Sequence, residues 1–444
     1  MENNSDHTSR IKIIFRSLQY RNYRLFFSGQ SISLIGTWMQ RIAMPWLVYH
    51  MTGSAFLLGV VSFAGQIPTF LLAPVAGVLT DKFSRYRVLL ITQIFSLLQA
   101  MILAILALTG IMQIWHLIVL SIVLGCINAF DVPSRHSFVV EMVEKKEDLG
   151  NAIALNSMMF NGARLIGPTV AGIMLATTGE GICFLINAFS YVFVIISLLM
   201  MKSEKKEIRK EKSNMLMDMK EGFNYTFGFA PIKYLLLLLG LVSLMGSSYQ
   251  VLIPVFAKEI LHGGSDTFGF LMGAAGFGAL LGAVYLASRE TILKLSRLIP
   301  AATALFGIGL VILSFSKLLI FSVTMMVFIG LGLMLQTASS NTILQTITDD
   351  DKRGRVMSFY TIAIMGTAPF GSLLAGYLAK LIGTPATILI SGATCLAGAL
   401  IFLKKLPELK TIVRPVYVKM GIIPEVAKGI ETASEPTADT SGLH

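Results

Sequence analysis

Two arginines, Arg41 and Arg164, stand within long apolar stretches of the chain, far from any cluster of charged residues. If these stretches cross a membrane, each charge costs about 2.5 to 3.5 kcal/mol on insertion scales, so each is expected to face a cavity and serve a function. We expect no carboxylate at the same depth, and two uncompensated guanidinium groups favour a ligand that carries an acid. The alternative is structural: Arg164 would bond to helix carbonyls and Arg41 would extend outward to the membrane surface.

Patterns for catalysis or cofactor binding do not stand out in the sequence. The three cysteines, Cys126, Cys183 and Cys395, are scattered singly through apolar segments without metal-ligand spacing. The sequence has no Gly-x-x-x-x-Gly-Lys-Ser/Thr loop for nucleotide phosphates, and its polar segments hold no catalytic triad or carboxylate pair. We therefore expect neither an enzyme nor a bound cofactor or metal.

The elements that must position the arginines are apolar helices. Hydrophobic residues make up 54% and charged residues 14% of the 444-residue chain, whereas about 25% of an ordinary soluble protein is charged. Apolar runs of roughly 20 residues, the length of a membrane-spanning helix, recur along the chain. We predict an all-α membrane protein with twelve transmembrane helices. Their expected bounds are 24–50, 55–80, 86–109, 113–134, 151–177, 182–201, 233–257, 267–288, 298–314, 318–345, 355–379 and 386–403.

The positive charges lie almost entirely on one side of these predicted helices. The net charge is +11, yet only Lys258, Lys317 and Lys380 of the 36 Lys and Arg residues fall in connections on the other side. Because cytoplasmic loops are rich in Lys and Arg, we expect both termini in the cytoplasm and a lipid bilayer, not nucleic acid, as the partner. The first residues are polar and basic, so we expect no cleaved signal peptide and place the chain in the inner (cytoplasmic) membrane of the cell.

A charged stretch in the middle of the chain divides six predicted helices from six. The expected order is a cytoplasmic N-terminal segment, a six-helix bundle, a cytoplasmic linker, a second six-helix bundle and a cytoplasmic tail that ends in disorder. The bounds of these parts are 1–23, 24–201, 202–232, 233–403 and 404–444.

The two halves repeat one another at an offset of 204 positions. At this offset five glycines of the first half, Gly150, Gly162, Gly167, Gly172 and Gly179, coincide with Gly354, Gly366, Gly371, Gly376 and Gly383. Glycines four or five residues apart let helix backbones approach closely, so we expect the halves to meet there. The predicted helix-packing residues are Gly162, Gly167, Pro168, Gly172, Gly366, Gly371 and Gly376.

The turn after the second predicted helix carries a motif, Gly77-Val-Leu-Thr-Asp81-Lys82-Phe-Ser84-Arg85-Tyr-Arg87. It resembles the loop motif of the major facilitator superfamily, Gly-x-x-x-Asp-Arg/Lys-x-Gly-Arg-Arg/Lys, with serine and tyrosine in place of one glycine and one base. The resemblance implies a fold of two six-helix bundles. It also implies that the motif aspartate meets the eleventh helix and that the motif arginine meets an acid near the end of the fourth.

Asp131 matches that acid in position. A carboxylate is stabilised both by the positive N-terminal end of a helix and by a guanidinium group. We therefore predict that Asp81, Arg85 and Asp131 form a latch that holds the outward-facing state. The predicted gate residues are Gly77, Asp81, Lys82, Arg85, Arg87 and Asp131.

Further stretches resemble the branch of the superfamily that contains the enterobactin exporter and the macrolide efflux pumps. They include Gly36-Thr-Trp38-Met-Gln40, Asp131-Val-Pro-Ser-Arg135 and Arg164-Leu-Ile-Gly167-Pro168. This resemblance implies export of a small amphipathic compound, siderophore-like or macrolide-like, in exchange for protons. The arginine pair favours an acid on that compound, and the lack of a nucleotide-binding loop indicates secondary transport; we expect a monomer. A flippase for lysophospholipid or another lipid is the alternative function. Asp131 is the one acid expected inside the membrane that could carry the proton.

In this superfamily the first, fourth, seventh and tenth helices surround the substrate cavity. Their polar and aromatic side chains are therefore candidate ligand contacts, although each could equally join helices or anchor them at the membrane surface. By the bounds above, the second half has no Lys, Arg, Asp or Glu within its helices, so we expect the charge chemistry in the first half. The predicted cavity residues are Arg41, Arg164, Gln40, Trp38, Asn128, Tyr249, Gln250, Gln336 and Asn341.

Overall fold

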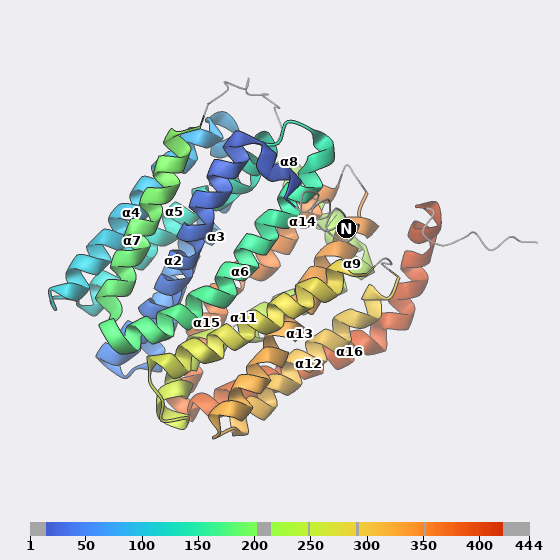
Figure 1. The fold of residues 1–444 in the computed structure, drawn as a ribbon. Coiled ribbons are helices and arrows are strands. Elements are labelled where there is room, and N and C mark those ends of the chain that lie inside the picture. Colours follow the sequence, from blue (N-terminus) through green and yellow to red (C-terminus); the bar gives the residue numbers. More distant parts are fainter. Residues whose placement is uncertain (1–14, 202–214, 247–248, 290–292, 350–351, 421–444) are drawn as a thin grey trace, which may run out of the picture.

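The computed structural model describes residues 15–201, 215–246, 249–289, 293–349 and 352–420, which fold almost entirely into helices (Figure 1). The first half contains a short 3-10 helix and six long α-helices. Their bounds are η1 Arg16–Gln19, α2 Arg21–Thr52, α3 Ala55–Lys82, α4 Arg85–Leu108, α5 Ile114–Glu141, α6 Lys146–Thr178 and α7 Glu180–Leu199.

The second half begins with a short helix and continues with six long helical segments, two of which contain π-helical turns. The bounds are α8 Met215–Gly228, α9 Ala230–Leu241, η2 Val242–Gly246, α10 Tyr249–Val255, η3 Phe256–Ile260, α11 Ser265–Ala287, α12 Leu295–Phe315, α13 Leu319–Ile347, α14 Arg353–Thr361, η4 Ile362–Gly366, α15 Ala368–Ile382 and α16 Thr384–Lys419. The π-helical turns are η2, η3 and η4.

Ten helical segments in the described part of the chain are long and apolar enough to cross a membrane. The long helices outside these ten are α2 and α6, which have 32 and 33 residues. Both contain many polar side chains, including Arg41 and Arg164, which lower their hydropathy. The predicted helical membrane fold is confirmed, whereas the count of twelve crossings stays a prediction.

Two segments that were expected outside the bundles contain helix. The predicted linker 202–232 includes α8, and α16 runs past its predicted end at 403 as far as Lys419. The charged residues after 403 lower the local hydropathy, so a hydropathy pattern does not predict this part of the helix. Its buried face is nevertheless apolar at helical spacing, with Leu406, Leu409 and Val413. The predicted disordered end of the tail falls in residues 421–444, which lie outside the described residues. The same holds for residues 1–14 and 202–214.

The helices form two bundles that meet along two helix pairs. Helix α6 packs on α11, and α3 packs on α15; Figure 1 shows α6 and α11 side by side between the two bundles. We call the end of the molecule that holds η1 and α8 the linker end. We call the other end, with the turns at Gly53, Gly179 and Gly383, the opposite end.

Gly179 and Gly383, which the repeat predicts to be equivalent, have the same role. They follow α6 and α15, and their φ angles are 85° and 84°. A side chain is strained in this left-handed region, so glycine ends both helices. This match supports the predicted repeat.

Candidate functional site

The two predicted arginines converge on one indole ring. The guanidinium carbons of Arg41 and Arg164 lie 4.8 and 6.0 Å from the centre of the Trp38 ring, within the range of cation–π attraction. Phe160 meets the same indole edge-on, with 5.8 Å between ring centres. The structure therefore brings together three of the predicted cavity residues, from α2 and α6.

Helix geometry and one glycine explain this meeting. Arg41 follows Trp38 by three residues, so the two side chains are neighbours on the surface of α2. A Cβ added to Gly167 would overlap the Cβ of Trp38, so only glycine lets α6 approach α2 here. Arg164, about one turn before this glycine, then reaches the same indole.

Arg135 of α5, which the sequence analysis did not select, adds a third positive charge. Its guanidinium and that of Arg164 lie close enough to Arg41 for the like charges to interact. The predicted fourth helix ended at 134, whereas α5 continues to Glu141, so Arg135 is inside the helix. We call Arg41, Arg135 and Arg164 the arginine cluster.

Arg41 and Arg164 are deep in the molecule but remain accessible. At 1.5 Å per residue, Arg41 is ~30 Å from the start of α2 and ~17 Å from its end, and Arg164 is ~27 Å and ~21 Å from the ends of α6. Arg41 is nevertheless exposed and Arg164 half-buried. Within the described part of the chain, neither side chain makes a hydrogen bond or an ion pair, so both can receive an anionic group.

Asp131 is the carboxylate that contacts the arginine cluster among the described residues. One oxygen, Oδ2, lies 3.5 Å from Nη2 of Arg135. The other, Oδ1, accepts hydrogen bonds from Thr92 at 3.0 Å and Gln93 at 2.7 Å, both on α4. One carboxylate cannot neutralise three guanidinium groups, so the cluster keeps a net positive charge.

The predicted latch differs from the structure in its acid. Arg85 donates a hydrogen bond of 2.7 Å to Glu141, while Asp131 binds α4 and Arg135 instead. Because α5 extends past its predicted end, Glu141 reaches the turn more easily than Asp131. The pairing of Arg85 with Asp131 is therefore wrong for this conformation, and the latch of the outward-facing state stays a prediction.

The other predicted gate residues give little further information. Arg87 is exposed. Gly77, Asp81 and Lys82 belong to α3, but their surroundings lie outside the described part of the structure, so a contact of Asp81 with the eleventh helix also stays a prediction.

Gln40 holds helices of the first bundle together, whereas it was predicted to line a cavity. Its side chain is buried, donates to Gln99 at 3.1 Å and accepts a hydrogen bond from Asn187 at 2.7 Å. Because both groups of its amide are used inside the first bundle, Gln40 joins α2, α4 and α7 and is not free to bind a ligand.

Among the predicted residues of the second half, Tyr249 interacts electrostatically with the arginine cluster. It is buried against Phe306 of α12, at 6.1 Å between ring centres, and the charge of Arg164 acts on it. The Nε2 atom of Gln336 is buried without a hydrogen-bond partner in the described chain. Three further predicted residues make no described contact with the arginines: half-buried Asn128, exposed Gln250 and half-buried Asn341.

The repeated glycines Gly172 and Gly376 lie where the two bundles cross near the opposite end. A Cβ added to Gly172 would be 2.7 Å from the Cα of Gly269 in α11. A Cβ added to Gly376 would be 2.7 Å from the carbonyl oxygen of Ala55 and 3.0 Å from the Cα of Gly59 in α3. Positions equivalent by the repeat therefore make equivalent crossings.

The remaining predicted packing residues divide into three kinds. Gly366 packs against Phe70 of the other half, and Gly371 packs against the backbone of η2 within its own half. Pro168 is buried inside α6. A Cβ added to Gly162 would meet nothing within 4 Å, so the prediction that this glycine serves close packing is wrong.

A polar contact that the sequence does not predict joins the halves at the opposite end. The hydroxyl of Tyr49 in α2 donates to the carboxylate of Glu259, and the ammonium of Lys258 lies 5.6 Å from the Tyr49 ring centre. The helix was expected to end at 257, but η3 continues it to Ile260. The second half therefore carries charged residues on a helix, contrary to the expectation of a neutral wall.

Comparison with known proteins places this chain among transporters. The family model described as transmembrane secretion effector matches residues 14–432. The staphyloferrin A transporter of Staphylococcus aureus is 26% identical over 381 residues, which cover 85% of this chain and 95% of that relative. The multidrug efflux pump Tap of Mycolicibacterium fortuitum is 26% identical over 84% of this chain and 93% of its own length. Macrolide efflux protein A of Streptococcus pyogenes is 23% identical over 86% and 96%.

Solved structures of transporters share the fold. A bacterial homologue of the human lysosomal transporter Spinster, in an inward-facing and unoccupied conformation, matches 90% of this chain and 98% of its own with a TM-score of 0.66 and 13% identity. A peptide transporter POT matches 88% and 95% with a TM-score of 0.69 and 12% identity. At these identities the likeness shows the fold alone. Fold and relatives together indicate a transporter, not an enzyme, and they confirm the resemblance found in the sequence. The chain belongs to the transmembrane secretion effector family of major facilitator superfamily transporters.

Proposed function

We propose that this transporter exports a small amphipathic compound that bears an acid, such as a carboxylate siderophore, with protons as the coupling ion. The arginine cluster is the observation that carries the proposal, because its three guanidinium groups have one carboxylate partner among the described residues, and the accessible Arg41 and Arg164 favour an anionic ligand. The similarity to a staphyloferrin A transporter supports a siderophore, and the similarity to Tap and macrolide efflux protein A supports efflux of amphipathic compounds.

In this proposal the ligand binds between Arg41 and Arg164 on the face of Trp38. The two guanidinium carbons lie within 4.8 and 6.0 Å of the indole centre, so an acid bound to either is held beside an apolar surface. A carboxylate can accept two parallel hydrogen bonds from one guanidinium group. This combination suits a compound with both acidic and apolar parts.

We propose further that α2 and α6 cross the membrane with the other ten segments, and that the linker end faces the cytoplasm. The concentration of Lys and Arg in the segments at the linker end supports this orientation. Three contacts join the halves near the opposite end: Tyr49 with Glu259, Gly172 with Gly269, and Gly59 with Gly376. With this end closed, the ligand enters from the cytoplasm, and opening of these contacts releases it outside.

Asp131 is the proposed carrier of the coupling proton. Protonation of Asp131 removes the negative charge beside Arg135 and so changes the charge of the arginine cluster by one unit. The affinity for an anionic ligand then depends on pH, so proton binding and ligand binding are linked.

The test is transport into proteoliposomes with an imposed pH gradient, using a carboxylate siderophore, a macrolide and a lysophospholipid in parallel. We expect siderophore transport that depends on the gradient. Arg164→Ala removes a charge-assisted hydrogen bond of about 1.5 to 3 kcal/mol, so affinity should fall roughly 10- to 150-fold. Arg24→Ala, at an exposed position near the linker end of α2, is the matched control.

Each outcome decides between stated alternatives. Siderophore transport that is unaffected by Arg164→Ala contradicts the role of the arginine cluster. Transport that ignores the pH gradient contradicts proton coupling but not the ligand class. Preferential transport of lysophospholipid supports the alternative function of a lipid flippase.

A further inference from the structure

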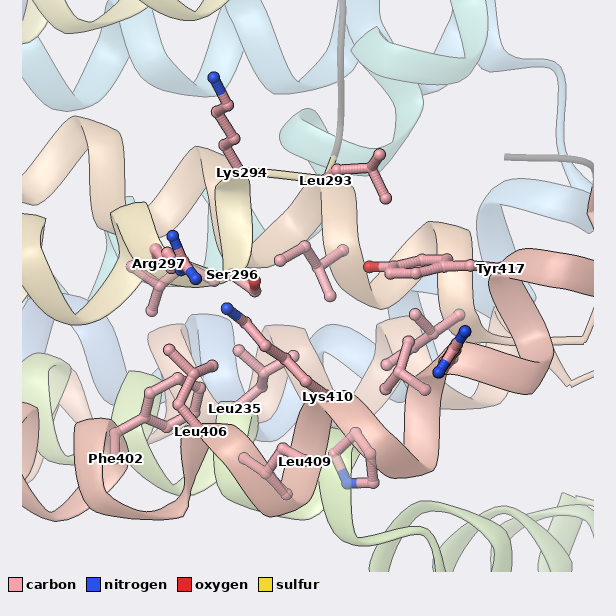
Figure 2. A pocket seen from close by; sticks show the side chains of 16 residues that line it. Leu235, Leu293, Lys294, Ser296, Arg297, Phe402, Leu406, Leu409, Lys410 and Tyr417 are labelled. Carbon is pink, nitrogen blue, oxygen red and sulfur yellow. The ribbon is translucent and has the colours of Figure 1, made fainter. Parts of the chain in front are cut away.

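The linker end of the second half contains a pocket that the proposed transport cycle does not use. It has a volume of about 320 Å³ and lies between the ends of α9, α12, α13 and α16 (Figure 2). It is formed within one bundle, away from the arginine cluster at the centre of the molecule. With the helices crossing the membrane as proposed, its position at helix ends lies at the depth of the lipid headgroups.

One part of the pocket wall is apolar. It is formed by buried side chains from three helices: Leu235 of α9, Ile299 of α12, and Leu406 and Leu409 of α16. On the outer side of α16, Leu403 is 51% exposed, as expected of a side chain that faces lipid tails. The apolar wall is thus close to the surface that the bilayer covers.

The rest of the lining is basic. Four of the described lining residues are basic and none is acidic: Lys294, Arg297, Lys410 and Arg414. Figure 2 shows the side chains of Arg297, Ser296 and Lys410 directed toward one another, whereas Lys294 points away. Arg297 and Lys410 lie close enough for their like charges to interact, and no described hydrogen bond or ion pair compensates either side chain.

We propose that this pocket binds an anionic phospholipid from the leaflet at the linker end. The phosphate accepts hydrogen bonds from Arg297 and Lys410, with the hydroxyl of Ser296 beside them, and one acyl chain follows the wall formed by Leu406 and Leu409. Basic pockets between membrane helices bind anionic headgroups, and a guanidinium group can donate two hydrogen bonds to one phosphate. The apolar wall next to the cations selects a lipid over a soluble phosphate.

The test measures lipid binding to the full-length protein purified in neutral detergent, by native mass spectrometry. The probes are phosphatidylglycerol, phosphatidylcholine with the same acyl chains, and soluble glycerol phosphate. The wild type should bind phosphatidylglycerol at least about tenfold more tightly than the other two. The double variant Arg297→Gln/Lys410→Gln should lose about 30-fold in affinity for phosphatidylglycerol, because two surface charges are removed.

Two further variants keep the test decisive. Lys404→Gln/Lys419→Gln removes the same charge from exposed positions of α16 outside the pocket and should bind like the wild type. Ser296→Trp fills the pocket without changing its charge and should also abolish binding, which covers the case in which the first double variant does not fold. Wild-type binding by Ser296→Trp or by a folded Arg297→Gln/Lys410→Gln protein overturns the proposal. Equal binding of both phospholipids, or glycerol phosphate binding as tightly as lipid, overturns it as well.

Discussion

Gly172→Ala should weaken the closure of the opposite end. The added Cβ would lie 2.7 Å from the Cα of Gly269 and 2.9 Å from the carbonyl oxygen of Ser265, both parts of the α11 backbone. Because carbon atoms in contact prefer about 3.5 to 4.0 Å, α6 and α11 must separate locally by about 1 Å. Backbone atoms cannot rotate away as a flexible side chain would, so the crossing itself has to open.

The size of the effect follows from the cost of overpacking. One extra carbon in a close-packed contact costs about 1 to 3 kcal/mol, and this cost applies only while the opposite end is closed. The ratio of open to closed molecules should therefore rise roughly 5- to 150-fold. Gly376→Ala, at the equivalent crossing with α3, should have a similar effect, and the two effects should add because the sites are distant.

The measurement is the distance between spin labels on the two halves at the opposite end. Met51 and Lys317 are exposed on either half and can be replaced by cysteine, after the three native cysteines are changed to alanine. Gly172→Ala should increase the fraction of long distances. Gly162→Ala is the matched control on the same helix, because its Cβ would meet nothing within 4 Å. If both variants give the wild-type distribution, the crossing does not control closure.

Three further predictions concern single side chains. Asp131→Asn should raise the affinity for an anionic ligand about tenfold near neutral pH and remove its pH dependence, because Arg135 loses its counter-charge; ligand titration across pH checks this. Glu259→Gln should open the opposite end about fivefold by weakening the hydrogen bond from Tyr49, as the same spin labels would report. At the linker end, the hydrogen bond of Tyr20 to Asp148 raises the pKa of this phenol above its usual value of 10.0. The contact stabilises the fold fully below pH 10, and this contribution is lost as the pH rises through the raised pKa, so Tyr20→Phe should lower the melting temperature at pH 8 and by progressively less as the pH rises above 10.

Each of these predictions has an outcome that contradicts it. An unchanged pH profile in Asp131→Asn would assign the proton to another group. A Glu259→Gln protein with wild-type distances would leave the glycine crossings as the closure. A Tyr20→Phe difference that does not shrink as the pH rises above 10 would show that packing, not the phenol proton, stabilises this contact.

The sequence predicted the frame of the molecule well because its signals are local and periodic. Apolar runs give the helices, and glycines that repeat 204 positions apart mark crossings that the structure places at Gly172 and Gly376. Gly162 shares the same spacing but packs on nothing. Spacing therefore identifies a helix face, but only the neighbouring helix decides whether a glycine on it is needed.

The site was predicted less completely, since it depends on helix ends and on partners distant in sequence. Arg135 and Glu141 were missed because charged residues seemed to end the fourth helix, whereas α5 carries them on one continuous helix. Glu259 was missed for the same reason, as a π-helical turn extends its helix. Gln40 has the residue type of a ligand contact, but its partners Gln99 and Asn187 lie on α4 and α7, which no local pattern reveals.

The positions along α6 suggest how ligand binding and closure are connected. Arg164 faces Trp38, Gly167 fixes α6 against α2 at that indole, and Gly172 makes the crossing with α11. These residues lie within about two turns of one helix, or roughly 12 Å. A ligand acid that draws Arg164 toward Arg41 acts on the same helix whose separation from α11 opens the opposite end. We therefore expect that a bound anionic ligand changes the spin-label distances in the wild type but not in Arg164→Ala; equal responses in both proteins would separate the arginine cluster from the closure.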